Sequence, residues 1–439
     1  MKVMKFGGTS VGSPQRMRDV CKLICGDSAQ KLVVLSAMSG TTNTLVEIAK
    51  CFENKDRNGA EAIIDRLQSL YSQHIANLYS TAIYKQNVQD FADSKFNYLK
   101  SFAEKPFTQD EEKEILAQGE LLSSFMLASF LCEQGYRAAL IPALEFMRID
   151  ENAEPDMEYI EKHINKFIDV DSDIQIYITQ GFICKNAQGK TDNLQRGGSD
   201  YTASIVGAAV QAEEIQIWTD IDGMHNNDPR IVHKTQPVRH LLFDEAAELA
   251  YFGAKILHPT CVQPAKAAGI PVRLLNTMQP DAPGTLINNE SEPGKIKAVA
   301  AKDNIIAINI KSSRMLLAYG FLRKVFEIFE NYKTPIDMIC TSEVGVSMSI
   351  DNPHNLDSII SDLRELGNVT VETDMCIICV VGDMKWNNVG FESRALDALS
   401  DIPVHMISYG GSSYNISFLI KAEDKKRALQ RLSDTLFKK

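Results

Sequence analysis

Short apolar runs alternate with helical stretches over the first 290 residues of the chain. The runs lie at 2–6, 32–35, 138–141, 174–178, 215–219 and 272–275, and the longest helical stretches lie at 41–99 and 109–132. Strands that alternate with helices in this way predict an α/β fold with a largely parallel central sheet. Of all the features of the sequence, this alternation limits the possible folds most.

A polar stretch at 288–294, after Pro283-Gly284, predicts a linker and a domain boundary near residue 290. Beyond it the chain contains a near-repeat. PIDMICTS (335–342) and VSMSI (346–350) are matched by PVHMISYG (403–410) and NISFLI (415–420). Each copy combines a helix, a strand that begins with proline, a turn of small residues and a second strand. Two similar small modules are predicted, with chance similarity as the alternative.

The charge of the chain argues against one class of partner. Its 439 residues include 57 acidic and 46 basic side chains, which gives a formal net charge of −11. Such a chain repels nucleic acid unless it carries a local basic patch, and the sequence contains no run of lysine and arginine of the kind that would form one. We therefore expect no nucleic-acid partner.

The sequence also carries no membrane signal. The first residues lack the apolar stretch of a signal peptide. No window approaches the roughly 18 uncharged apolar residues that span a bilayer. We therefore expect a cytoplasmic protein with no membrane partner.

Nine cysteines are present, but the number is odd and their spacing is irregular. The one CxxC pair, Cys376 and Cys379, lies in an apolar run (375–381) that is typical of a strand. Residues three apart on a strand point to opposite faces and cannot share one metal ion. We therefore expect no metal bound by protein side chains alone.

The first candidate for chemistry is a glycine-rich turn, KFGGTS (5–10), at the end of the first expected strand. A lysine beside two glycines places a cation where the backbone can approach a ligand closely. Unpaired amide donors and a helix that begins at Ser13-Pro14 favour an anion, most often phosphate. The segment is neither a Walker A loop nor a dinucleotide fingerprint. A plain glycine turn is the alternative.

Three later segments carry similar groups. QRGGSD (195–200) is a second glycine-rich turn, and its arginine suits a carboxylate or phosphate. TDIDG (219–223) and Arg230 follow a strand, where α/β sheets bind ligands. Lys255, in FGAKILHP, adds another cation. Taken singly, these segments could be an ordinary turn with a local ion pair, a polar loop and a solvated lysine.

Together these motifs resemble those of the aspartate kinases (aspartokinases), which are members of the amino-acid kinase family. KFGGTSVG, SAMSGTTN, GELLS, RGGSD, TDIDG with DPR, and FGAKILHP occur in the order of the family from end to end. The combination of KFGGTS and RGGSD is the most specific part of the likeness. The resemblance implies a three-layer α/β sandwich followed by tandem ACT domains, which are of the ferredoxin-like α+β type.

The resemblance also implies domain bounds. The amino-acid kinase catalytic domain would span 1–290 and the regulatory region 295–439. The first ACT domain (312–373) would be inserted into the second (295–311 and 374–439). No dehydrogenase segment follows residue 439, so the monofunctional form is expected.

The implied reaction is transfer of the γ-phosphoryl group of MgATP to the β-carboxylate of L-aspartate, the first step of lysine, threonine and methionine biosynthesis. Mg²⁺ would be held mainly by the ATP phosphates. The implied catalytic residues are Lys5 and Asp200. The implied aspartate-binding residues are Ser36, Thr42, Glu120, Arg196, Gly197, Gly198 and Ser199. The implied ATP-binding residues are Lys5, Gly7, Gly8, Thr9, Ser10, Thr219, Asp220, His225, Arg230 and Lys255.

Some of these residues have a specific implied role. Lys5 would neutralise the transferred group, and Asp200 would orient Lys5. Arg196 would clamp the α-carboxylate of aspartate, while Glu120 would accept hydrogen bonds from its α-ammonium group. Lys255 would hold ATP phosphates.

An effector site is implied as well, similar to that of the lysine-sensitive aspartokinases. Its residues would be Met315, Ala318, Phe321, Leu322, Asp337, Ser342, Glu343 and Val344. Asp337 and Glu343 would pair with the ammonium groups of the effector, which we expect to be L-lysine. ACT domains pair edge to edge, so we expect a homodimer or a tetramer. ACT domains that serve only in dimerisation are the alternative.

Three positions depart from the family pattern. Gln195 replaces the first glycine of the second turn, and His225 stands where many relatives carry a tyrosine near the adenine. Ala318 replaces a serine of the effector site. These changes bear on nucleotide affinity and on effector sensitivity.

Two rival functions remain at this point. One is another amino-acid kinase, acting on glutamate or acetylglutamate, although such kinases lack the ACT pair. The other is a catalytically inert amino-acid sensor, against which the intact Lys5, Arg196, Asp200 and Lys255 argue.

Overall fold

The computed structural model describes residues 1–168, 173–194, 197–253, 257–315 and 319–437. The chain divides into two compact units. The first comprises Met1–Met224 and Leu257–Asn289, and the second comprises His225–Ile256 and Glu290–Lys439. The predicted boundary near residue 290 coincides with one of the crossings between the units. Residues 225–256, however, belong to the second unit.

The first unit alternates strands and helices, as predicted from the sequence. Its elements are β1 (Lys2–Phe6), α1 (Pro14–Ile24), β2 (Lys31–Leu35), α2 (Thr41–Glu53), α3 (Arg57–Leu78), α4 (Ala82–Ser101), η1 (Phe102–Glu104), α5 (Gln109–Glu133), β3 (Ala138–Ile141), α6 (Ala143–Phe146), α7 (Met157–Ile164), β4 (Ile176–Gln180), β5 (Ile183–Lys185), β6 (Thr191–Asn193), α8 (Gly198–Ala209), β7 (Glu214–Thr219), η2 (Pro259–Val262), α10 (Gln263–Ala268), β9 (Val272–Asn276) and β10 (Thr285–Asn288).

The sheet of this unit runs in the order β3-β4-β2-β1-β7-β9-β10. All neighbouring pairs from β3 to β9 are parallel, and β10 joins β9 antiparallel. The largely parallel sheet predicted from the sequence is therefore confirmed. The carboxyl ends of β1, β2, β4, β7 and β9 lie at one edge, where parallel sheets bind ligands.

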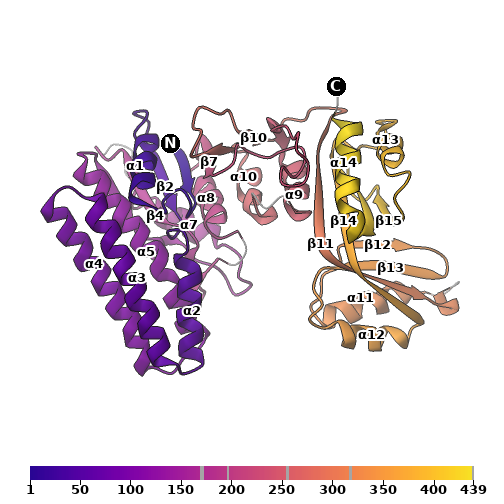
Figure 1. Cartoon of the computed structure of the whole chain (residues 1–439), viewed down its shortest axis with the longest axis horizontal. Coiled ribbons are helices and arrows are strands. Elements are labelled where there is room, and N and C mark those ends of the chain that lie inside the picture. Colours follow the sequence, from indigo (N-terminus) through magenta and orange to yellow (C-terminus); the bar gives the residue numbers. More distant parts are fainter. Residues whose placement is uncertain (169–172, 195–196, 254–256, 316–318, 438–439) are drawn as a thin grey trace. The chain divides into compact units, whose positions relative to one another are not determined.

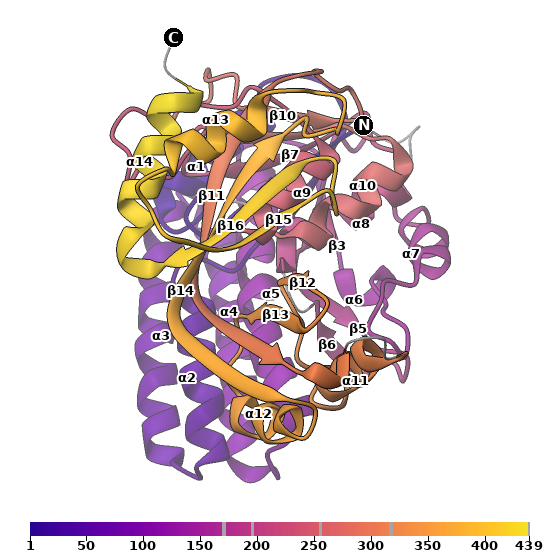
Figure 2. The same cartoon turned by 90° about the vertical axis from the view of Figure 1, so that its right-hand side faces the viewer.

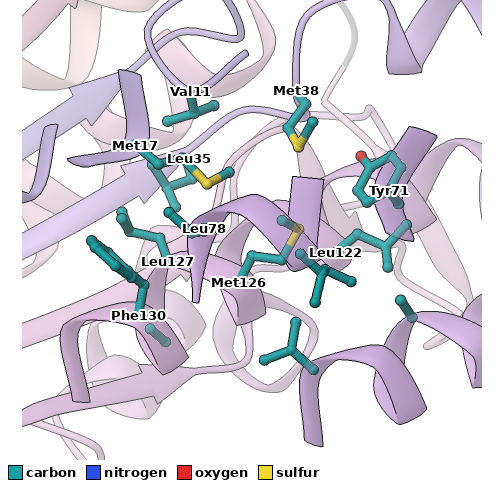
Figure 3. Close-up of a cluster of buried hydrophobic side chains, with 14 of the residues drawn as sticks. Val11, Met17, Leu35, Met38, Tyr71, Leu78, Leu122, Met126, Leu127 and Phe130 are labelled. Atoms are coloured by element: carbon teal, nitrogen blue, oxygen red, sulfur yellow. The ribbon is translucent and has the colours of Figure 1, made fainter. Parts of the chain in front are cut away.

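The long helices α2 to α5 cover one side of this sheet (Figure 1). Their apolar faces share one large core with β1, β2 and α1. Val11, directly after the first glycine-rich turn, and Met38, after β2, are buried in the same core together with Met126 of α5 (Figure 3). Burial of these side chains fixes both segments that follow the central strands.

Helix α5 is buried over most of its surface. Thr108 and Glu111 form a capping box at its start, which satisfies amides that the helix itself leaves unpaired. One 18-residue window of α5 has a mean hydropathy of 1.5, but 72% of that window is buried within the protein. Its composition is therefore that of a core helix, and it carries Glu120 into the interior.

The second unit is built on a six-stranded antiparallel sheet. The sheet order is β12-β13-β11-β14-β16-β15. Its elements are β8 (His240–Leu242), α9 (Phe243–Tyr251), β11 (Ile296–Lys311), η3 (Ser313–Met315), α11 (Phe321–Asn331), β12 (Met338–Thr341), β13 (Gly345–Ile350), α12 (Leu356–Arg364), β14 (Asn368–Gly382), α13 (Phe391–Ala398), β15 (Val404–Tyr409), β16 (Asn415–Lys421), η4 (Ala422–Asp424) and α14 (Lys425–Leu436).

Strands β11 and β14 lie side by side along their whole length (Figure 2). Residues 296–302 pair with 377–382, while residues 305–311 pair with 368–375 and with β13. Irregular register between Lys302 and Ala307 separates the two halves, and Asn304 and Asp374 adopt positive φ there. The long strands therefore each take part in two half-sheets.

Each half-sheet has its own core. One core packs β11, β13 and β12 against α11 and α12, with Phe321 and Phe329 at its centre. The other packs β14, β16 and β15 against α13 and α14, with Phe391 and Phe418. The near-repeat of the sequence thus corresponds to two similar folded modules. Their edge strands meet within the chain, because the Cys340 thiol of β12 donates to the Ile407 carbonyl of β15 at 3.1 Å.

Candidate active site

The two glycine-rich turns meet at an ion pair. Lys5 is the penultimate residue of β1, and Asp200 lies in the first turn of α8. The Lys5 ammonium is 2.6 Å from the Asp200 carboxylate, and the two side chains are only 10% and 17% exposed. A Cβ atom placed on Gly7 would lie 3.5 Å from the same ammonium. The structure therefore places the lysine cation over the first turn and holds it there from the second.

The first turn retains free amide donors. The Ser10 amide donates to the Gly7 carbonyl, and the Gly8 carbonyl accepts from the Ser39 amide. In the part of the chain that the structure describes, the amides of Gly8 and Thr9 have no hydrogen-bond acceptor. A Cβ atom on Gly8 would come within 2.7 Å of the Ala37 carbonyl oxygen, so only glycine fits there. Two free amides beside a buried ammonium group favour an anion.

Glu120 is a buried carboxylate that is only half satisfied. Its Oε1 accepts from the amide of Ala37, two residues after the end of β2, at 3.0 Å. Its Oε2 is buried and has no hydrogen-bond donor among the residues described. Burial raises the pKa of Glu120 to about 8, and the Ala37 hydrogen bond opposes that rise only in part. The unpaired Oε2 of Glu120 can therefore accept a hydrogen bond from a cationic ligand.

The second turn begins α8 with two glycines in the left-handed region. Gly197 has φ +86° and Gly198 has φ +42°. A Cβ atom on Gly197 would collide with the Cys261 sulfur, at 2.2 Å. Ser199 is buried and lies against Gly181, just after β4. Arg196, the predicted clamp, and Gln195 lie outside the described residues.

Two further residues predicted to bind aspartate, Ser36 and Thr42, lie in the stretch of chain that follows β2. The Ser36 amide donates to the Phe6 carbonyl, and the Ser36 carbonyl accepts from the Ser123 hydroxyl of α5 at 2.8 Å. Thr42 is half-buried in the first turn of α2. Its neighbour Thr41 is fully buried, with its hydroxyl 3.0 Å from that of Tyr71. The predicted aspartate-binding residues that the structure describes all lie in the first unit.

The residues predicted to bind the nucleotide divide between the units. Thr219 is the last residue of β7 in the first unit, and Asp220 follows it; the Thr219 hydroxyl accepts from the Ile221 amide. His225 and Arg230 belong to the second unit. His225 Nδ1 lies 2.9 Å from the Thr235 hydroxyl. Lys255 lies outside the described residues.

Arg230 is engaged locally. Its guanidinium donates to both oxygens of Asp228, at 2.9 and 2.7 Å, while remaining largely exposed. The Arg230 guanidinium holds the pKa of Asp228 below its ordinary value. A phosphate that binds Arg230 must therefore share it with Asp228.

The predicted effector residues surround the turn between β12 and β13. Ser342, Glu343 and Val344 are exposed in that turn. Phe321 is buried at the start of α11, Leu322 is exposed beside it, and Met315 is half-buried. Ala318 lies outside the residues described.

Asp337 already has partners within the chain. Its side chain is 1% exposed, and its Oδ1 accepts from Lys302 at 2.6 Å and from the Tyr251 hydroxyl at 2.7 Å. The Lys302 ammonium also lies over the Tyr251 ring. The second oxygen, Oδ2, is buried and has no donor within the described ranges. An effector ammonium that pairs with Asp337 would have to share its carboxylate with Lys302.

Sequence reasoning missed two residues of the site. Phe182 adopts φ +69°, and its ring lies 3.3 Å from where a Gly198 Cβ would stand. Thr277, just after β9, joins the hydroxyl of Ser10 at 2.7 Å. The position of Thr277 at the carboxyl end of a predicted parallel strand was a usable signal, whereas nothing in the sequence marks Phe182.

Among the described residues, no three His, Cys, Asp or Glu side chains gather into a group that could hold a metal ion. The groups that converge here are an ammonium, free amides and carboxylates. This arrangement suits a phosphorylated ligand that brings its own cation.

Comparison with known proteins gives the family. Residues 1–276 match the model of the amino acid kinase family, and residues 378–436 match an ACT domain model. The chain is 33% identical over 457 residues to the lysine-sensitive aspartokinase 3 of Escherichia coli K12, covering 99% of both chains.

Solved structures agree with this match. The crystal structure of E. coli aspartokinase III in complex with aspartate and ADP superposes with a TM-score of 0.86 at 30% identity, covering 100% of both chains. The structure of the same enzyme with lysine and aspartate gives a TM-score of 0.81 at 31% identity, again over the full length of both chains. The chain therefore belongs to the aspartokinases, within the amino acid kinase family.

Proposed function

We propose that the protein transfers the γ-phosphoryl group of MgATP to the β-carboxylate of L-aspartate, giving 4-phospho-L-aspartate and ADP. The observation that carries this proposal is the Lys5–Asp200 ion pair, which brings the two glycine-rich turns together. The similar E. coli enzyme was solved with aspartate and ADP. The reaction belongs to the synthesis of the aspartate-derived amino acids, and we assign it to the cytoplasm.

The acceptor needs no general base. A free carboxyl group has a pKa of about 3.9, so at neutral pH it is already an ionised nucleophile. A carboxylate oxygen attacks the γ-phosphorus in line while the bond to the β–γ bridging oxygen breaks, and ADP leaves. This chemistry explains why the described site holds no serine or histidine base.

The main barrier is electrostatic. Two like charges about 4 Å apart repel by about 4 kcal/mol at an effective dielectric constant near 20. The Lys5 ammonium offsets this repulsion at the transferred group, and the amides of Gly8 and Thr9 receive phosphate oxygens. Mg²⁺ would be held by the ATP phosphates and would offset part of the remaining negative charge. Asp200 holds the ammonium in place, since the two lie 2.6 Å apart.

Aspartate is bound through the two charged groups on its α-carbon and through its β-carboxylate. Glu120 receives the α-ammonium group on its unpaired Oε2, and Arg196 clamps the α-carboxylate. Ser36, Thr42 and the amides of Gly197, Gly198 and Ser199 position the β-carboxylate. Within the first unit, Thr219 and Asp220 contribute to binding of the nucleotide.

The two modules of the second unit are the regulatory part, with bounds near 295–439. The effector is L-lysine, as in the name of the similar E. coli enzyme. Glu343 is exposed and pairs with one ammonium group of the effector. Asp337 offers its unpaired Oδ2 to the other. The assembly is at least a homodimer.

A substrate comparison tests the proposed reaction. The protein is incubated with MgATP, hydroxylamine and either aspartate, glutamate or acetylglutamate, and the acyl phosphate is trapped as a hydroxamate. We expect product from aspartate alone. Product from glutamate or acetylglutamate would favour another amino-acid kinase, and no product from any of them would favour an inert sensor.

Replacing Lys5 with methionine keeps the buried stem and removes the charge. We expect kcat to fall by about 10³-fold or more, because the ammonium acts on charge in the transition state. Lys31→Met is the matched control, because Lys31 is also buried, lies on the adjacent strand and is paired with Asp27. Equal losses in the two variants would show a general cost of removing a buried lysine rather than a catalytic role.

The raised pKa of Glu120 gives aspartate binding a pH dependence. Below about pH 8 the free protein holds a proton on Glu120, and the incoming ammonium group must displace it. We expect the Kd for aspartate to fall up to tenfold per pH unit from pH 6 to 8, with about one proton released. Calorimetry in buffers of different ionisation enthalpy measures this release. In Glu120→Gln the proton release should vanish, whereas Glu245→Gln, another buried glutamate with a raised pKa, should retain it.

The raised pKa of Glu120 also makes the free energy of unfolding depend on pH. The folded pKa is higher than the ordinary value of 4.5, so between pH 4.5 and 8 the folded state binds more protons than the unfolded state. The contribution of Glu120 is complete below pH 4.5, and the free energy of unfolding then falls by up to about 1.4 kcal/mol per pH unit as pH rises to 8. Glu120→Gln should lose this slope in denaturant titrations without aspartate.

Two substitutions separate the roles of the effector carboxylates. Glu343→Gln should raise the lysine concentration for half-inhibition at least tenfold and leave the uninhibited rate unchanged. Lys302→Met should lower that concentration, because Asp337 no longer shares its carboxylate with a lysine of the chain. Lys311→Met, an exposed lysine on the same strand, is the control. Weaker inhibition in Lys302→Met would show that Lys302 instead orders Asp337 for the effector.

A further inference from the structure

A hydroxyl relay joins three strand ends beneath the first glycine-rich turn. The Ser10 and Thr277 hydroxyl oxygens are 2.7 Å apart, and the Thr277 hydroxyl lies 2.8 Å from the Thr219 carbonyl oxygen. The Thr277 amide donates to that same carbonyl at 2.8 Å. Ser10 is 1% exposed and Thr277 is 8% exposed. The relay thus connects the turn after β1, the end of β7 and the residue after β9.

The direction of the relay follows from counting protons. A hydroxyl group has one proton, and a carbonyl oxygen can only accept. The Thr277 proton therefore goes to the Thr219 carbonyl. The Ser10 hydroxyl must then donate its own proton to Thr277.

This count leaves Ser10 without a donor for a ligand. Its hydroxyl proton goes to Thr277, and its amide donates to the Gly7 carbonyl. The Gly7 amide is directed to the Trp218 carbonyl, at 3.4 Å. The donors left in the turn are those of Gly8 and Thr9. Ser10 was expected from the sequence to supply a donor to ATP, but its donors are committed to the protein.

We propose that Thr277 is a positioning residue for phosphoryl transfer, which acts through Ser10 to hold the amides of Gly8 and Thr9 at the phosphate position. The inference rests on the proposed kinase function. The Thr277 hydroxyl is bonded on both sides to the protein, to Ser10 and to the Thr219 carbonyl, so it acts through its neighbours. It also fixes Thr219, which precedes the nucleotide residue Asp220, so one side chain sets the phosphate turn against the end of β7.

The relay makes a specific kinetic prediction. Thr277→Val keeps the shape of the side chain and removes the hydroxyl group, so Ser10 loses its acceptor. We expect the KM for MgATP to rise about tenfold and kcat to fall at least tenfold, with the KM for aspartate changed less than twofold. Thr277→Ser restores the hydroxyl and should return both parameters to within threefold of wild type.

Further variants separate positioning from general stability. Thr334→Val is the matched control, since it removes another buried threonine hydroxyl, bonded to the Tyr332 carbonyl, from the second unit. It should leave the KM for MgATP unchanged. Ser10→Ala should reproduce Thr277→Val, and the double variant should be no worse than either single one, because both break one relay.

The outcomes are distinguishable. A wild-type protein that forms no hydroxamate would overturn the proposed function. An active wild type with unchanged kinetics in Thr277→Val, or a loss that Thr277→Ser fails to restore, would overturn the relay. Additive losses in the double variant would also overturn it.

Discussion

The site depends on keeping one cation in a buried position of an acidic protein. The Lys5 ammonium lies over the first glycine-rich turn because Asp200 holds it there from the second. Without the carboxylate the ammonium would lose its partner in a largely buried place, and burial disfavours the charged form of a lysine. Two turns that are far apart in the sequence are thus tied together by a single contact between opposite charges.

The parallel sheet makes this contact possible. Five strand ends lie along one edge, and each is followed by small or polar residues that pack against the next segment. Gly8 fits against Ala37, and Gly197 fits against Cys261. The relay of Ser10, Thr277 and Thr219 extends the same principle to β7 and β9. The amides that face a ligand are therefore fixed by packing and by hydrogen bonds made below them.

The pattern of apolar residues along the sequence predicted the fold, because alternating strands and helices have apolar residues at regular intervals. The glycine-rich motifs also predicted Lys5 and Asp200 as site residues, whereas Glu120 was predicted only from the resemblance to the aspartokinases. The sequence shows that Thr277 follows a predicted parallel strand, but it could not show the hydrogen bond of Thr277 to Ser10, which lies 267 residues away. Nor could it show that Asp337 is already engaged by Lys302 and Tyr251, because that contact depends on how α9 packs on β11 and β12. No local pattern in the sequence indicates that residues 225–256 belong to the second unit.

The two regulatory modules have no separable boundary. Strand β11 begins in one half-sheet and ends in the other, and β14 does the same in the opposite direction. If the chain were divided between β11 and β14, each of the two pieces would contain strand residues whose hydrogen-bond partners lie in the other piece. We therefore expect the two modules to fold and unfold together, because two continuous backbones run through both of them.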